Sequence, residues 1–327
     1  MDSLTPSVKP HRPSLPLKVG TRGSPLARAQ TATFLALLQH FCPVLKGMEV
    51  FEEHIITTTG DAVQDRPLAE IGGKGLFAKE IHESLLAHRI DFAVHSLKDL
   101  ETTLPDGITL ACTLKREDAR DVLILPANTP IDASDPYASL PPGAVIGSAS
   151  VRRQSQLKHA RPDLKFALLR GNVGTRLAAV ESGACAATLL AMAGLKRLNL
   201  HHRASIPLST ETMVTSACQG IVGITIRSAD KELFSLLSGI EDPEAKAVAT
   251  AERALLAALD GSCRTPIGGY ARLLADGRLH LTGLIARADG TFLLQRSATA
   301  AKSEAARLGR ELGESLKADS PPDIFAI

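Results

Sequence analysis

The sequence predicts an α/β protein of two or three domains. From residue 17 onward, short apolar runs alternate with helical patterns, which is typical of a largely parallel sheet covered by helices. At 327 residues, the chain is too long for one ordinary hydrophobic core. After residue 241 the pattern changes to hairpin-like strands, so the last part is expected to differ in kind from the rest.

The first half contains four predicted strands and two predicted helices. Ser24 is a good helix N-cap and Pro25 suits the first helical position, so a helix should follow the first strand directly. The strands are expected at residues 17–19, 50–57, 91–95 and 108–114, and the helices at 26–41 and 74–88. The charged residues 115–121 are interpreted as a crossing between domains.

A second set of alternating elements follows. Its strands are expected at 145–147, 164–169 and 186–190, and its helices at 151–160, 175–182 and 193–198. Strand 221–226 is predicted to return to the first domain. In the last part we expect a helix at 248–259, strands at 270–274, 279–285 and 291–298, and a helix at 300–317. Asp289-Gly290 is predicted to form the turn between the last two strands.

Composition excludes several classes of protein. The hydrophobic content of 44% with 22% charged residues indicates a soluble globular chain. The sequence contains no run of 18 apolar residues, so no membrane span is predicted. A net charge of +2 and an aromatic content of 3% argue against nucleic acid as a partner. The five scattered cysteines form neither a disulfide framework nor a zinc motif, so we expect a reducing compartment and no metal. Residues 1–16 are predicted to be a disordered leader rather than a secretory signal.

Cationic side chains gather in turns that follow strands or open helices. Ligands of open α/β sheets bind outside the carboxyl ends of the strands, where backbone N–H groups can help to hold carboxylate or phosphate. Four such turns are expected to face one crevice: 21–24, 72–75, 148–153 and 170–176. Neither P-loop nor dinucleotide spacing is present. Because arginine matches planar carboxylates, a ligand with several carboxylates is favoured, although any single turn could simply be solvated.

Two further residues could carry chemistry. Asp99 follows a strand at the edge of the predicted crevice, where it could stabilise a developing cation or shuttle a proton, or simply cap a helix or pair with Lys98. His95 and Asp99 lack a third ligand, so a metal is rejected. Cys263 lies on a glycine-bracketed loop beside Arg264, whose positive field would favour a reactive thiolate. A lone cysteine can equally be a small buried hydrophobe.

Together these motifs resemble the hydroxymethylbilane synthase family, also called porphobilinogen deaminase. The matching segments occur in family order and cover most of the chain from residue 17 to the Cys263 loop. They are 20–27, 72–77, 93–99, 151–154, 170–176, 193–197, 219–220 and 261–267. The chain departs from the family pattern at Glu70, where lysine is common, at Glu101, where proline is usual, and at Cys218 before Gln219-Gly220.

The resemblance implies three domains, the first two like type II periplasmic binding proteins and the third a small α+β unit. The implied boundaries are 17–116 with 219–239 for domain 1, 117–218 for domain 2 and 240–327 for domain 3. It also implies a transferase of porphyrin, heme and chlorophyll biosynthesis. Such an enzyme joins four porphobilinogen molecules head to tail with loss of ammonia, and then releases hydroxymethylbilane by hydrolysis. A dipyrromethane cofactor would be bound to Cys263 through a thioether.

The resemblance also assigns roles to individual residues. Asp99 would be catalytic, lying beside the pyrrole N–H and stabilising the azafulvene cation that forms when ammonia leaves. The cofactor would be held by Cys263, Lys74, Lys98, Ser150, Arg152 and Arg153. The substrate and the growing chain would be bound by Arg22, Ser24, Arg170, Arg176, Arg197 and Gln219.

Two other classes of function compete with this interpretation. A binding protein for a small polycarboxylate would explain the cationic crevice but not the third domain or Cys263. A cysteine hydrolase would need a histidine to activate Cys263, and none is near it in the sequence. We expect a monomer that binds neither nucleic acid nor membrane, located in the cytoplasm or, alternatively, in the plastid stroma.

Overall fold

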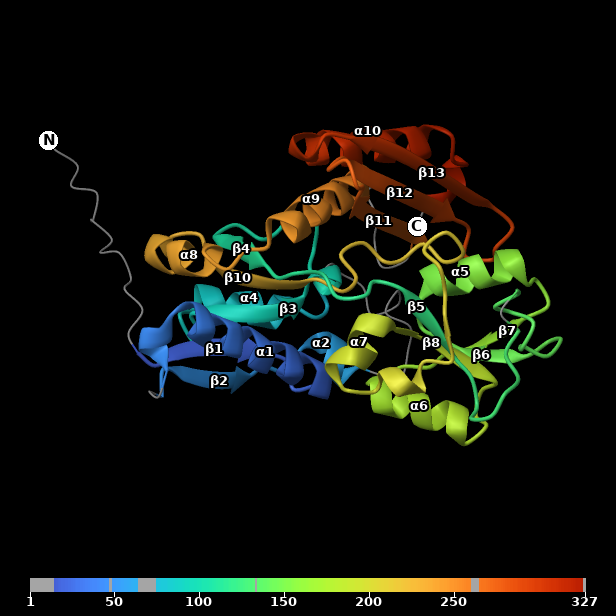
Figure 1. The fold of residues 1–327 in the computed structure, drawn as a ribbon, viewed down its shortest axis with the longest axis horizontal. Helices are drawn as coiled ribbons and strands as arrows, with labels where there is room; N and C mark the ends of the chain where they lie inside the picture. Colours follow the sequence, from blue (N-terminus) through green and yellow to red (C-terminus); the bar gives the residue numbers. More distant parts are fainter. Residues whose placement is uncertain (1–14, 47–48, 64–74, 133, 260–264, 326–327) are drawn as a thin grey trace, which may run out of the picture.

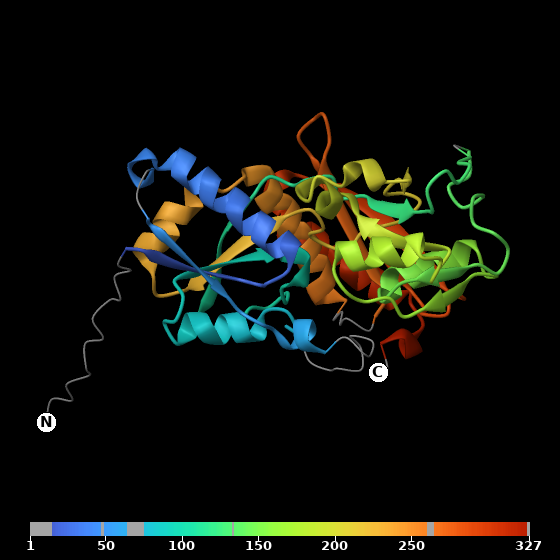
Figure 2. The same ribbon diagram turned by 90° about the horizontal axis from the view of Figure 1, so that it is seen from below.

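The computed structural model describes residues 15–46, 49–63, 75–132, 134–259 and 265–325. These residues form three β-sheets, two of which lie in lobes side by side while the third covers the region where the lobes meet (Figure 1; Figure 2). The predicted α/β class is confirmed. Within the described part of the chain, no helix is long and apolar enough to cross a membrane.

The first sheet has the strand order β2-β1-β3-β10-β4. Its strands are β1 (Leu17–Thr21), β2 (Phe51–Ile55), β3 (Phe92–Ser96), β4 (Ile108–Thr113) and β10 (Val222–Arg227). Strand β1 runs parallel to β2 and β3, whereas β10 is antiparallel to both of its neighbours. The predicted return of the chain at residues 221–226 is therefore confirmed.

Four helices of the described residues accompany this sheet. They are α1 (Pro25–Phe41), α2 (Thr59–Ala62), α4 (Lys79–Leu86) and α8 (Lys231–Ser238). Ser24 caps α1 and Pro25 occupies its first turn, as predicted. Helix α4 begins later than expected, because Gly75 has a φ of +78° and the residues after it form a turn.

The second sheet repeats this plan with the order β7-β6-β8-β5-β9. Its strands are β5 (Asp121–Ile124), β6 (Val145–Gly147), β7 (Lys165–Ala167), β8 (Ala187–Ala191) and β9 (Ile206–Pro207). Its helices are α5 (Val151–Ala160), α6 (Val173–Glu181) and α7 (Met192–Arg197). Strands β5 and β9 were not predicted: residues 115–121 were interpreted only as a crossing, yet a fully buried strand begins at their end.

The third sheet is an antiparallel meander of β11 (Ile267–Leu273), β12 (Leu279–Ala286) and β13 (Leu293–Ala300). Helices α9 (Pro243–Ala258) and α10 (Ala305–Ala318) pack against each other and against this sheet. Helix α9 starts earlier than predicted because Asp242 accepts hydrogen bonds from two N–H groups of its first turn. Helix α10 starts later, after a short 3-10 turn at Lys302–Glu304.

One hydrophobic core joins the third sheet to the first lobe. It contains apolar residues of α9, α10 and β12, and also Leu97 and Leu100. Leu97 is the first residue of η2 (Leu97–Asp99), the 3-10 turn that follows β3, and Leu100 directly follows the turn. Because both leucines are buried, the turn is fixed in place with its polar residues directed away from the core.

Candidate active site

Asp99 and Lys98 lie on the turn that ends β3, where the sequence predicted a site. Strand β3 is central in the first sheet, so its carboxyl end delivers this turn to the region between the lobes. The Asp99 side chain is 29% exposed, and its carboxylate lies 3.6 Å from the guanidinium of Arg22. Lys98 is exposed, so its ammonium group is accessible to a ligand.

Arg22 comes from the end of the neighbouring strand β1. Its Nε donates to Asp61 Oδ2 at 3.0 Å, and its guanidinium lies 4.2 Å from the centre of the Phe77 ring. Burial opposes the charge of Arg22, but the hydrogen bond to Asp61 and the charges of Asp99 and Asp61 outweigh it and raise the pKa. The sequence did not point to Asp61 or Phe77 as partners of Arg22, because helix α2 carries Asp61 and the turn before α4 carries Phe77, both distant from Arg22 along the chain.

Asp121 organises the second lobe's part of the site. It opens β5, has no exposed surface, and accepts hydrogen bonds from Arg152 Nη1 and Arg153 Nη2, each at 2.7 Å. Burial alone would raise the pKa of Asp121, but the two arginines hold it far below its usual range. An acidic residue at the start of a wholly apolar run, as in Asp121 before Val122, is the sequence signal that could have revealed this residue.

The contacts of Arg152 and Arg153 differ from those expected. Both are buried, and besides Asp121 they donate to main-chain carbonyls, Arg152 to Val214 and Arg153 to Leu189. Their guanidinium groups therefore hold α5 against β5 and β8. A direct role for either arginine in cofactor binding stays a prediction.

Gln219 connects the two lobes rather than facing a ligand. Its side-chain oxygen accepts a hydrogen bond from Lys98 Nζ at 3.2 Å, and its nitrogen donates to Asp121 Oδ1 at 2.9 Å and to the Ala119 carbonyl at 2.7 Å. Since Gln219 has no exposed surface, the amide cannot reach a ligand directly in this arrangement.

The remaining predicted arginines reach the same region from the second lobe. Arg170 donates to the Gly60 carbonyl of the first lobe at 3.0 Å. Arg176, on the first turns of α6, donates to the Gly171 carbonyl, and Arg197, at the end of α7, donates to the Gly220 carbonyl. The predicted substrate-binding arginines thus gather where the lobes meet.

This gathering carries a surplus of positive charge. Burial, followed by repulsion from Arg153 and Arg170, lowers the pKa of Arg176 to about 10. Burial also lowers the pKa of Lys98, with Arg153 and Arg152 acting in the same direction and Asp99 and Asp121 against it. Lys98 is open to solvent, which weakens the effect of burial, but the direction agrees with its cationic neighbours. An anion bound here would relieve the repulsion.

The two predicted serines serve as helix caps. Ser24 Oγ accepts a hydrogen bond from Ala27 N at 3.3 Å, and Ser150 Oγ accepts one from Arg153 N at 3.4 Å. Each hydroxyl keeps its proton for a ligand, but the structure itself requires only the caps.

Two residues assigned to cofactor binding, Lys74 and Cys263, lie outside the described residues, as does Arg264. The other four cysteines are described, and the surroundings of three of them make those three poor nucleophiles. Cys112, Cys185 and Cys218 are buried, and burial raises the pKa of all three thiols, to about 12 for Cys112 and Cys218. Cys42 is half-buried and lies at the end of α1.

His95 is neutral inside the first lobe. Its Nε2 lies 2.8 Å from the Thr225 hydroxyl, and burial, aided by the nearby His82 and Arg22, lowers its pKa to about 3. Among the described residues, no group of three or more His, Cys, Asp or Glu side chains could hold a metal ion.

A second buried carboxylate, Glu252 on α9, links β11 of the third sheet to the connections between the two lobes and was not predicted. Glu252 accepts hydrogen bonds from Arg116 Nη1 at 2.6 Å and from the backbone N–H groups of Cys218 and Ala271. Arg116 also donates to the Gln219 carbonyl. Both connections between the lobes are therefore attached to the helix that leads toward Cys263.

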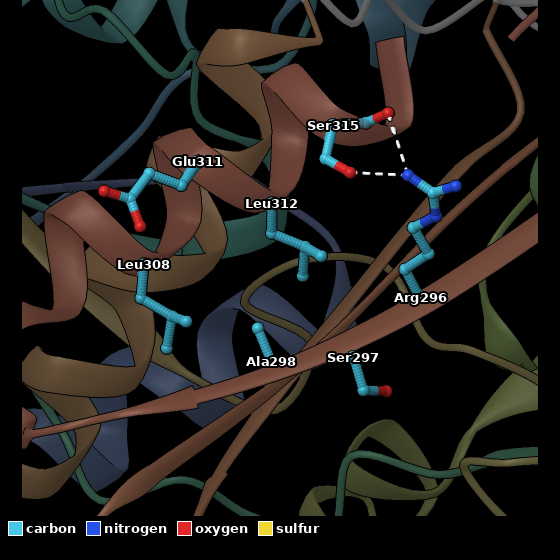
Figure 3. A pocket seen from close by; sticks show the side chains of 7 residues that line it. All are labelled: Arg296, Ser297, Ala298, Leu308, Glu311, Leu312 and Ser315. Carbon is cyan, nitrogen blue, oxygen red and sulfur yellow. Dashed lines mark hydrogen bonds between the residues drawn. The ribbon is translucent and has the colours of Figure 1, made fainter. Parts of the chain in front are cut away.

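Open pockets also occur among residues that do not belong to the predicted site. One, of about 330 Å³, lies between β13 and α10 and is lined by Arg296, Leu308 and Ser315 among others (Figure 3). Arg296 donates to Ser315 there, and none of the lining residues belongs to the predicted site. Another, of about 430 Å³, lies beside the connection between the lobes and includes Arg116 and Tyr270.

Comparison with known proteins bears on the whole chain. Residues 17–235 match the family profile described as "Porphobilinogen deaminase, dipyromethane cofactor binding domain", and residues 246–318 match "Porphobilinogen deaminase, C-terminal domain". Porphobilinogen deaminase of Paracoccus denitrificans is 45% identical over 96% of this chain and 97% of that protein. The chloroplastic porphobilinogen deaminase of Oryza sativa is 44% identical over 94% of this chain and 85% of that protein.

Among solved structures, the periplasmic VFT2 domain of BvgS from Bordetella pertussis is similar to this chain. It is 15% identical, covers 72% of this chain and 92% of that domain, and has a TM-score of 0.39. The sequence matches extend over both lobes and the third sheet. The chain belongs to the porphobilinogen deaminase family.

Proposed function

We propose that this protein is a hydroxymethylbilane synthase, the transferase activity that the family name porphobilinogen deaminase denotes. It would condense four porphobilinogen molecules head to tail, with loss of ammonia, and release the linear tetrapyrrole by hydrolysis. One observation carries the proposal: Lys98 and Arg176 lie close enough to interact electrostatically with Asp99, and Arg197 donates to Gly220, next to Gln219. Within the described residues, none of these three cations forms an ion pair with a carboxylate.

The donor set fits a dipyrromethane group. Each pyrrole of this cofactor carries an acetate and a propionate. In the part of the chain that the structure describes, the three cations donate to neutral oxygens of Gln219, Gly171 and Gly220. Such cations have donors available for carboxylates. The proposed set is Cys263, Lys74, Lys98, Ser150, Arg152 and Arg153. When bound, the cofactor would supply the pyrrole carbon from which the chain of rings grows.

Asp99 is proposed to act on the substrate. A positive charge develops when ammonia leaves porphobilinogen, and an ionised carboxylate nearby stabilises it. Arg22 pairs with Asp61 and also lies 3.6 Å from Asp99, so its guanidinium orients the Asp99 carboxylate. Leu97 and Leu100 hold the turn rigid, so little reorganisation is needed when the charge forms.

Arginines of both lobes are proposed to bind the growing chain of pyrrole rings. Arg22 belongs to the first lobe, and Arg170, Arg176 and Arg197 to the second. Because each added ring brings two more carboxylates, distributed cations can hold successive rings without a separate site for each. Ser24 would add a hydrogen bond. Gln219, which the resemblance assigned to the same set, is buried and hydrogen-bonds Lys98 instead.

The proposal places a monomer in a reducing compartment, the cytoplasm or the plastid stroma. Buried free thiols at Cys112, Cys185 and Cys218 support a reducing compartment. A reversible polycarboxylate-binding protein would share the cationic region but would have no use for Asp99 beside it.

Incubation with porphobilinogen alone tests the proposal. A synthase releases ammonia in proportion to porphobilinogen consumed and yields a linear tetrapyrrole, which absorbance after oxidation and mass spectrometry detect. A binding protein would return porphobilinogen unchanged after denaturation, with no ammonia formed, and that result would overturn the proposal.

A further inference from the structure

The side chain of Gln219 links Lys98 to the second lobe through hydrogen bonds. The Lys98 ammonium donates to Gln219 Oε1 at 3.2 Å, and the other end of the same amide donates to Asp121 Oδ1 at 2.9 Å. Asp121 in turn binds Arg152 and Arg153. A chain of hydrogen bonds therefore runs from an exposed lysine of the first lobe to a buried cluster of the second.

Gln219 is held in place independently of Lys98. Its main-chain carbonyl accepts a hydrogen bond from Arg116 Nε at 2.8 Å, and its side-chain nitrogen donates to the Ala119 carbonyl. The next residue, Gly220, accepts hydrogen bonds from Glu117 N and from Arg197. Both connections between the lobes thus fix the amide, which can then fix the flexible lysine.

We propose that Gln219 is a positioning residue, which locates the Lys98 ammonium and stabilises its charge by linking it to the Asp121–Arg152–Arg153 cluster, and not a direct ligand of the substrate. That the fixed Lys98 ammonium serves to bind pyrrole carboxylates rests on the proposed function. The link itself does not, because it is made entirely of this chain's own groups.

The charges around Lys98 explain why such a link is needed. Arg153 and Arg152 repel the ammonium, Asp99 and Asp121 attract it, and the surrounding protein disfavours its charge, so its pKa lies below the ordinary value. An amide oxygen that accepts from the ammonium favours the charged form. Without that oxygen, the Lys98 pKa should fall further, and the side chain should lose its fixed position.

The test follows the reactivity of the Lys98 amine across pH in the full-length protein. Only the neutral amine reacts with formaldehyde and cyanoborohydride, and mass spectrometry of the peptide containing Lys98 gives the midpoint of the labelling profile. In Gln219→Met the midpoint should fall by about one pH unit, as expected for loss of one hydrogen bond to a charged group. In Gln219→Glu an oxygen still faces Lys98, so the midpoint should stay at or above that of the unmodified protein.

Gln156→Met is the matched control. Gln156 is also a buried glutamine with three hydrogen bonds, to Val214 N, Val214 O and Arg152 O, and none of them involves Lys98. Its loss should leave the Lys98 midpoint unchanged. An unchanged midpoint in folded Gln219→Met, or an equal fall in Gln156→Met, would overturn the inference. Since labelling requires no turnover, either result is independent of whether the protein is a synthase.

Discussion

Asp99 differs from most acidic residues of this chain in its surroundings. Other carboxylates form ion pairs that stabilise the fold: Asp121 binds two buried arginines, and Asp163 is paired with Arg161. Asp99 keeps a 3.6 Å contact with Arg22 and remains 29% exposed beside cations of both lobes. Its charge is therefore available to a cation that develops on a bound substrate.

Replacement of Asp99 by asparagine should keep the fold and the shape of the side chain but remove its charge. We expect the rate of porphobilinogen consumption to fall by about a hundredfold to ten-thousandfold, the range typical of lost charge stabilisation or proton transfer. Steady-state assays with circular dichroism as the check of folding would measure this. Asp163→Asn removes an exposed carboxylate from the same chain and should leave the rate unchanged. Near-normal turnover in Asp99→Asn would show that the carboxylate only binds.

Residues at strand ends could be predicted, whereas their partners could not. Asp99 and Arg22 were found because each lies in a turn that follows a predicted strand, and Lys98, in the same turn as Asp99, was assigned its role through the family resemblance. Asp121 precedes Arg152 by 31 residues and meets it only after the second sheet has formed, so no local pattern revealed the pair. For the same reason, Gln219 was expected to face the substrate, while the structure buries it between the lobes.

Helix α9 attaches the two chain segments that join the lobes to the third sheet. Glu252 lies on its buried face with no exposed surface, and Arg116 and two backbone N–H groups surround its carboxylate. Burial raises the Glu252 pKa, although Arg116 and the backbone donors oppose that effect. A carboxylate with these donors stabilises only if all of them remain paired.

Glu252→Ala should destabilise the protein by about 3 to 5 kcal/mol, because Arg116 and two N–H groups would lose their acceptor together. The midpoint of urea unfolding, followed by circular dichroism, would report the loss. Glu311→Ala removes an acid that pairs with Arg307 on the exposed face of helix α10, and its midpoint should hardly move. Equal midpoints for the two variants would mean that α9 is not fixed through Glu252.

The limits of helices were harder to predict than their existence. The structure bears out the predicted bounds of α5, Val151–Ala160. Helix α9 was predicted to start at residue 248, but the cap at Asp242 moves its start to Pro243. Strand β5 was missed because the charged residues before it hid a short apolar run that is fully buried. Caps and short buried strands depend on partners that an apolar pattern does not contain.

At the scale of the whole molecule, three sheets meet at one cationic region. The first supplies Arg22, Lys98 and Asp99, and the second supplies Arg170, Arg176 and Arg197. The third is joined to both through Glu252 and through the core around Leu97. This arrangement suits a bound chain of carboxylated rings that must move past one fixed acidic residue while staying attached to the third domain.

The central claim is that a dipyrromethane group is bonded to Cys263, and the intact mass of the purified, denatured protein tests it most directly. A thioether survives denaturation, so the mass should exceed that of the polypeptide by two pyrrole units. Cys263→Ser should abolish the added mass, whereas Cys185→Ser, which alters a buried thiol with a raised pKa, should retain it. A freshly purified, active protein with only its polypeptide mass would contradict the account.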